Sequence, residues 1–187
     1  MRSFLDAVRL HVERFHPQEL AGEDSHAAHS RARTLALLET QQPCDRRQFA
    51  PGHLTASAIV LSPDHRQILL VHHKRLNRWL QPGGHIEADD PSPEDAARRE
   101  TIEETGVDID SNTAASLTGV DVHEIPAARG EPTHLHHDLL WRFVAASEGI
   151  RVSSESNAVT WAGIDELDRY DLDAPLLANI ARAIKSR

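Results

Sequence analysis

Residues 84–107 read GHIEADDPSPEDAARRETIEETGV, and this stretch decides the fold of the chain. Ser92 is a preferred N-cap residue, and Pro93 is favoured at the first position of a helix. Gly106 is the residue type that most often follows the last helical turn. The stretch therefore predicts a loop followed by a helix that begins at Pro93 and ends before Gly106.

Three carboxylates lie on one face of this predicted helix. At 100° per residue, Glu103 lies about 60° to one side of Glu100 and Glu104 lies about 40° to the other. Like charges at these spacings repel, and the last helical turn disfavours anions. A bound divalent cation such as Mg²⁺ reverses both effects, because it takes carboxylate oxygens as ligands. The residues expected to face the core instead are Thr101, Ile102 and Thr105.

The charge of the chain is concentrated in the same region. Ten acidic and two basic residues lie within 85–110, a local charge of −8 out of a formal net charge of −9 over 187 residues. A cation site explains such clustering better than a general solubilising charge does. The acidic balance also argues against a partner of duplex nucleic acid, since such proteins carry a basic face.

The stretch from Gly84 to Val107 resembles the Nudix box, whose pattern is G-x5-E-x7-R-E-U-x-E-E-x-G-U with U an apolar residue. The half R-E-x-x-E-E-x-G matches residue for residue, starting at Arg99. Upstream, Asp90 stands where the family has Glu, and Arg99 comes one residue late. A one-residue insertion in the loop explains both departures, and the loop carboxylate is then Asp90 or, if the insertion lies elsewhere, Asp89.

The resemblance implies an α/β fold, a Nudix-like α/β/α sandwich with a mixed sheet. The pattern of apolar runs and turn residues agrees with this order. We expect an N-terminal helical extension over 1–50 and a Nudix hydrolase domain over 51–187. The expected strands are 54–62, 67–73, 79–87, 116–125, 134–145 and 157–164, and a closing helix is expected over 173–184.

The N-terminal extension carries an apolar stripe at helical spacing. Its members are Phe4, Val8, Val12 and Phe15. A lone helix of about 14 residues is marginal in water, so the stripe must pack on its own domain or on a second subunit of a homodimer. A second helix, capped by Asp24 or Ser25, is expected to run to about Gln41. We expect these helices to border the pocket.

The resemblance implies hydrolysis of a diphosphate bond in a nucleoside diphosphate linked to another moiety, with Mg²⁺ or Mn²⁺ as cofactor and a nucleotide or similar small molecule as substrate. Glu100, as general base, and Glu103, as the other candidate for that role, form with Arg99 the catalytic set. The expected metal ligands are Glu100, Glu103, Glu104, the Gly83 carbonyl and Glu155.

A second group of candidate residues is rich in histidine. Strand alternation places His134, His136 and Asp138 on one face, which is a transition-metal site, a polar face donating hydrogen bonds to substrate phosphate, or a solvated strand face. The candidate substrate contacts are His85, Arg78, His134 and His136, with Lys74 and Arg75 as further basic residues. Trp79 and Trp141 are candidates for stacking on a base.

Two other functions stay open at this point. One is a non-catalytic Nudix-fold module that senses a nucleotide, although such proteins usually have damaged boxes. The other is an isopentenyl-diphosphate isomerase-like enzyme, which needs a catalytic cysteine at the pocket, whereas Cys44 lies in the extension. A single cysteine and the lack of a long apolar run favour a cytoplasmic protein without a membrane partner.

Overall fold

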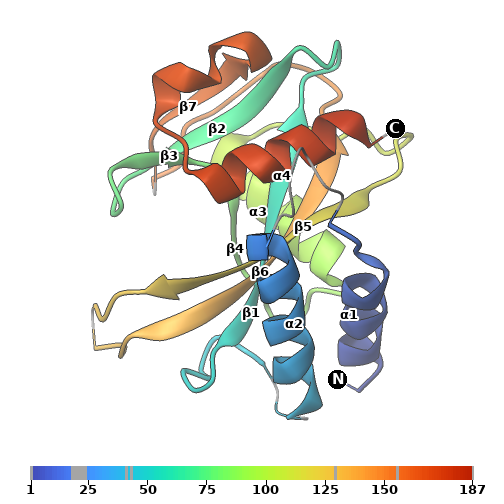
Figure 1. Cartoon of the computed structure of the whole chain (residues 1–187). Coiled ribbons are helices and arrows are strands. Elements are labelled where there is room, and N and C mark those ends of the chain that lie inside the picture. Colours follow the sequence, from blue (N-terminus) through green and yellow to red (C-terminus); the bar gives the residue numbers. More distant parts are fainter. Residues whose placement is uncertain are drawn as a thin grey trace.

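The structure is a computed structural model that describes residues 2–17, 25–40, 42, 44–128, 130–154 and 156–186. Figure 1 shows a sheet with helices on both sides of it. The elements are α1 (Arg2–Arg14), α2 (Ser25–Glu39), β1 (His53–Leu61), β2 (Gln67–His73), β3 (Arg78–Leu80), β4 (Gly83–His85), α3 (Pro93–Thr105), β5 (Ser116–Ile125), β6 (His134–Val144), β7 (Ser156–Gly163), the 3-10 helix η1 (Ile164–Tyr170) and α4 (Ala174–Lys185).

The seven strands form one mixed sheet. Its path runs β3-β2-β1-β6-β5, while β4 pairs with β1 and β7 pairs with β2. The long central pair β1 and β6 is parallel, from His53 opposite His136 to Leu61 opposite Val144, and the other pairs are antiparallel. The expected strand 79–87 is two short strands with a break between them, and η1 was not predicted.

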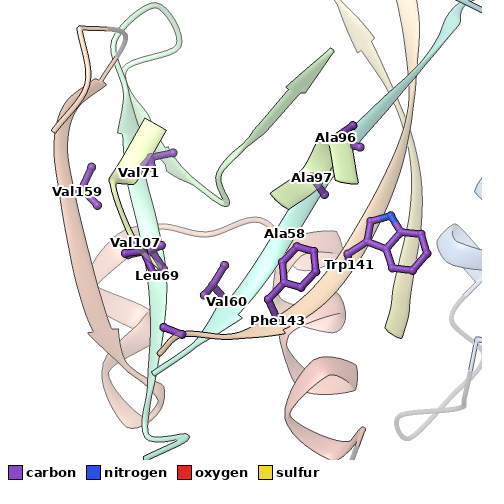
Figure 2. Packing of buried hydrophobic residues seen from close by; sticks show 12 residues of the cluster. Ala58, Val60, Leu69, Val71, Ala96, Ala97, Val107, Trp141, Phe143 and Val159 are labelled. Atoms are coloured by element: carbon purple, nitrogen blue, oxygen red, sulfur yellow. The ribbon is translucent and has the colours of Figure 1, made fainter. Parts of the chain in front are cut away.

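Side chains of β1 and β6 point alternately to the two faces of the sheet and belong to two core layers, one on each face. One layer packs Ala58, Val60, Trp141 and Phe143 against Ala97 of α3 (Figure 2). The other packs Ile59, Leu61, Leu140 and Val144 against Leu176 and Ile180 of α4. The α/β/α sandwich expected from the sequence is therefore confirmed.

Helix α3 has the predicted ends. Ser92 accepts a hydrogen bond from the Asp95 N–H, and Gly106 closes the helix with φ 67°. Thr101 and Thr105 are fully buried, as expected. Ile102 was wrongly assigned to the core, because the residue is 40% exposed. The core-facing stripe of α3 runs through Ala97 and the two threonines, which lie on another side of the helix from Ile102.

The N-terminal helices pack within the chain. Val8, Val12 and Phe15 form a buried cluster with residues of α2 and with Leu54, Val120 and Leu139 of the sheet. Arg31 of α2 also donates to the carbonyl oxygens of Val12 and Glu13, at 2.9 and 2.8 Å. The stripe is thus covered by the chain's own domain. The second helix begins at Ser25; Asp24 and Gln41 lie outside the described residues.

No helix in the described part of the chain combines the length and the apolar character that crossing a bilayer requires.

Candidate functional site

A groove of about 910 Å³ opens beside the carboxylate face of α3. Glu100, Glu103 and Glu104 all line it, together with Gly83 and Gly84. The three carboxylates differ in environment. Glu104 is buried at 7% exposure, the Glu100 side chain is 16% exposed, and the Glu103 side chain is 59% exposed. The groove is thus lined by a graded set of anions running from its wall to solvent.

Arg99 organises these carboxylates. Its guanidinium donates from Nε and Nη2 to the two Asp90 oxygens at 3.0 and 2.8 Å. Nη1 donates to Glu100 at 2.9 Å and to Glu103 at 3.1 Å, and Nη2 also donates to the His85 carbonyl oxygen at 3.0 Å. These hydrogen bonds, the one to Asp90 foremost, raise the pKa of Arg99. The planar fork therefore fixes the loop and the helix relative to each other.

The predicted contact between Asp90 and Arg99 is present. Burial raises the pKa of the Asp90 carboxyl, but the hydrogen bonds from Arg99 and from the Glu87 N–H outweigh it, and the pKa is lowered overall. Asp90 thus stays ionised as the partner of the arginine. For Asp89, which is exposed, no such contact with Arg99 is recorded among the described residues.

Two glycines permit the close approach of β4 to α3 and β1. The Gly83 N–H donates to Glu104 Oε2 at 3.0 Å, and a Cβ on Gly83, whose φ is 157°, would lie 2.2 Å from the Ser57 Cβ. A Cβ on Gly84 would lie 2.7 Å from the carboxyl carbon of Glu100. A side chain at Gly83 would push β4 away from β1, and one at Gly84 would displace the Glu100 carboxylate, which explains the glycine pair that the sequence places here.

The donor set on α3 fits a hard divalent cation. Carboxylate and carbonyl oxygens are the ligands that Mg²⁺ takes. In this structure the arginine fork and the Gly83 N–H hold the carboxylates, and their oxygens do not form a group of three within 4.8 Å of one another. A cation bound here would draw the glutamate side chains together and would offset their mutual repulsion.

The structure separates the predicted substrate contacts. His85, His136, Lys74 and Arg75 line the groove. Arg78 is absent from the described groove lining, and its guanidinium pairs with Asp173 at 3.0 Å. His134 is 4% exposed and stacks on another histidine ring. Glu155, a predicted metal ligand, lies outside the described residues, although its neighbour Ser154 lines the groove.

Neither candidate for base stacking, Trp79 or Trp141, lies among the described residues of the groove lining. Trp141 was wrongly considered for base stacking, because it is 1% exposed and belongs to the core under α3 (Figure 2). Trp79 makes edge contacts with Tyr170 and His72 at 5.3 and 5.0 Å between ring centroids. We expected the N-terminal helices to border the groove, but no described residue of α1 or α2 lines it. The segment that connects α2 to β1 lines it through Arg46, the one lining residue from the described part of 1–50.

His134, His136 and Asp138 were expected to share one face of β6 and one role. The structure instead gives Asp138 a role of its own. This carboxylate is 4% exposed and accepts hydrogen bonds from Thr55 at 2.9 Å and Ser57 at 2.5 Å. Burial, only partly offset by these donors, raises its pKa. A solvated face is therefore excluded. Asp138 accepts from Thr55 and Ser57 of β1 and from Gln81, and among the described residues no histidine beside it donates to it.

Sequence reasoning missed several groove residues that other strands and loops supply. They are Arg46, Thr55, Ser57, Gln81, His123 and Glu131. Thr55 and Ser57 carried one usable signal, since small hydroxyl residues alternate along an otherwise apolar strand. The connector and loop residues carried none, because only the fold brings them to the groove.

Comparison with known proteins agrees with this geometry. Residues 51–184 match the family model of the NUDIX domain. A MutT-like protein from Streptomyces ambofaciens is 31% identical over 131 residues, covering 70% of this chain and 77% of that protein.

Solved structures share the fold. The NUDIX domain of Shewanella oneidensis NrtR, in complex with ADP ribose, superposes with a TM-score of 0.58 at 20% identity, covering 80% of this chain and 96% of that one. The mutator MutT protein from Bacillus halodurans gives a TM-score of 0.55 at 24% identity, covering 71% and 82%. From the family match, the arginine-linked carboxylate helix and the shared fold, the chain belongs to the Nudix hydrolases, a family that acts on phosphoanhydride bonds.

Proposed function

We propose that the protein is a metal-dependent pyrophosphohydrolase that cleaves the diphosphate bond of a nucleoside diphosphate linked to another moiety. The observation that carries the proposal is the Arg99 network, which holds Glu100 and Glu103 at the groove while Asp90 anchors the guanidinium from the loop. A damaged site, as expected of a pure nucleotide sensor, would lack one of these partners.

Mg²⁺ or Mn²⁺ is the proposed cofactor, held by Glu100, Glu103, Glu104, the Gly83 carbonyl and Glu155. When bound, such ions neutralise charge on the bridging phosphates and lower the pKa of a coordinated water. Glu100 is the proposed general base and Glu103 the other candidate. Both accept from the same Arg99 nitrogen, at 2.9 and 3.1 Å, so the arginine orients either carboxylate toward a water in the groove.

The rest of the groove suits a phosphorylated ligand of nucleotide size. Its volume of about 910 Å³ lies in the range of small-molecule sites. Arg46, Lys74 and Arg75 bring positive charge to its lining, opposite in sign to a diphosphate. His85 and His136 are the proposed polar contacts to the substrate, made directly or through a bound metal ion. The ADP ribose held by the Shewanella NUDIX domain is one member of the proposed substrate class.

The deciding experiment is a screen of nucleoside diphosphate and triphosphate derivatives with Mg²⁺ and with Mn²⁺, reading release of phosphate or nucleotide. We expect activity on at least one compound and its loss in excess chelator. Millimolar Mg²⁺ should also raise the melting temperature, since the metal binds only the folded state. Binding of a nucleotide without release of any product would contradict the hydrolase and favour the sensor.

A further inference from the structure

Three histidines from three strands converge beside the groove, and two of them, His85 and His136, line it. His53 of β1 lies directly opposite His136 of β6 in the parallel register, and His85 of β4 lies opposite Thr55, two residues along β1. The ring centroids are 4.7 Å apart for His53 and His136, 5.2 Å for His53 and His85, and 5.3 Å for His85 and His136. One nitrogen of each ring lies within 4.8 Å of the other two.

One ring nitrogen of His53 is left as an acceptor. His53 is fully buried, and its Nδ1 lies 3.1 Å from the Gln48 carbonyl oxygen. An oxygen acceptor requires the proton on Nδ1, so Nε2 carries the lone pair. Among the described residues, neither Nε2 of His53 nor Nε2 of His136 has a hydrogen-bond partner. A buried nitrogen without a partner is uncommon and calls for a ligand.

The surroundings keep the imidazoles neutral and in place. Burial, with mutual repulsion among the rings as a smaller cause, lowers the pKa of His85 and His136, and burial lowers that of His53. His134 stacks on His53 at 5.0 Å, and its own Nδ1 lies 2.7 Å from the Pro132 carbonyl oxygen. For His53, the Gln48 carbonyl on Nδ1 is the arrangement that usually orients a metal-binding histidine.

We propose that His53, His85 and His136 bind a transition-metal ion of the Zn²⁺ class, at a site separate from the carboxylates of α3. Neutral imidazole suits Zn²⁺, Cu²⁺ and Ni²⁺, whereas Mg²⁺ prefers oxygen. Tetrahedral coordination with Zn–N bonds of about 2.0–2.1 Å needs the nitrogens about 3.3 Å apart, so the rings close in by small rotations on binding.

The fourth coordination position of this site faces the groove. His85 and His136 both line the groove, while His53 lies behind them and is fully buried. Three protein ligands with one open position are typical of a site that takes up an external ligand, in contrast to a closed structural site. The chemical class of that ligand is an anionic oxygen, such as a phosphate oxygen of a molecule bound in the same groove.

The test uses the full chain, stripped with chelator and returned to millimolar Mg²⁺ so that the oxygen site is occupied. Zn²⁺ is titrated by calorimetry and Co²⁺ by visible absorption. We expect one ion per chain despite the Mg²⁺, with the strong absorption of four-coordinate Co²⁺. His136→Gln and His85→Gln should each weaken Zn²⁺ binding by more than about 100-fold, a larger loss than that from an outer-shell change.

Two variants serve as controls. His72→Gln removes a histidine from β2 that contacts Trp79 and Asn157 and is absent from the cluster, so it should bind Zn²⁺ like the wild type. Glu103→Gln should also retain Zn²⁺ binding even if it abolishes hydrolysis, which separates this proposal from the proposed function.

Three results would overturn the site. They are Zn²⁺ binding that Mg²⁺ competes away, unchanged binding by both cluster variants, and loss of Zn²⁺ binding in Glu103→Gln. If the cluster variants fail to fold, X-ray absorption of the wild type with Zn²⁺ decides, since three imidazole nitrogens support the site and an all-oxygen shell contradicts it.

Discussion

We expect the carboxylates of α3 to act through their charge, and this makes their substitution informative. Glu103→Gln and Glu104→Gln remove an anion while keeping shape, so the fold should persist or gain from reduced repulsion. We expect the initial rate of hydrolysis with Mg²⁺ to fall by at least about 100-fold in either variant. Glu94→Gln, at the opposite end of α3 and paired with Arg98, is the matched control. Near-normal turnover in either test variant would refute the ligand assignment.

Arg99 offers a second test at the level of one residue. Its fork spans Asp90, Glu100 and Glu103, and a lysine ammonium cannot make these planar contacts together. Arg99→Lys should therefore lower kcat strongly although the charge is kept. Asp90→Asn should cost less than either α3 glutamate variant, and Asp89→Asn less again. Should Asp89 prove the sensitive position, the loop insertion must be moved by one residue.

The same ion pair predicts a pH dependence of stability. The pKa of Asp90 is lowered in the folded state, so its contribution is present above about pH 4, where the unfolded carboxyl ionises. The contribution is lost as the pH falls through the lowered folded pKa. In denaturant titrations, the stability difference between wild type and Asp90→Asn should be largest near neutrality and shrink below pH 4. A difference that stays constant with pH would show that the charge of Asp90 is unimportant.

Among the elements, the connector between α2 and β1 carries a buried thiol whose reactivity can be measured. Cys44 is 3% exposed, and burial, with a smaller effect of Asp45, raises its pKa to about 11. The native thiol should thus carry about 100-fold less thiolate at pH 8 than an ordinary cysteine of pKa 9. Iodoacetamide labelling, followed by mass spectrometry, should be slow without urea and fast with it. Equal rates would mean that the connector opens readily.

The elements also show how far the sequence could lead. The ends of α3 were predictable because Ser92, Pro93 and Gly106 act locally. The contact of Asp90 with Arg99 followed from the motif and spans only nine residues. By contrast, the parallel pairing of β1 with β6 is a long-range property that no local pattern encodes.

The histidine cluster was missed for the same reason. Strand alternation grouped His134, His136 and Asp138, which lie on one strand. In the structure, the close group is His53, His85 and His136, which come from three different strands. Alternation likewise placed Trp141 on the face opposite the histidines but could not tell that α3 covers that face.

For the whole molecule, the N-terminal helices should be needed for solubility. Deleting residues 1–50 uncovers Leu54, Val120 and Leu139, which are at most 2% exposed in the full chain. We expect aggregation or altered specificity, measured by light scattering and by the substrate screen. A milder probe is Leu37→Ala in α2, which should cost about 2–5 kcal/mol of unfolding free energy, with exposed Leu10→Ala as control. A truncated protein that is soluble, monomeric and equally active would make the extension a passive appendage.

Helix α2 packs on strands β5 and β6, which come much later in the sequence. This sets the order in which the parts of the molecule can assemble during synthesis. Thr34 contacts His137 at a separation of 103 residues, and Ser30 accepts from the Val122 N–H at a separation of 92. The helices therefore leave the ribosome well before the strands that cover their apolar stripe. Until β6 emerges, that stripe is exposed to other nascent chains and to chaperones. The part of the protein that is made first is thus among the last to reach its place.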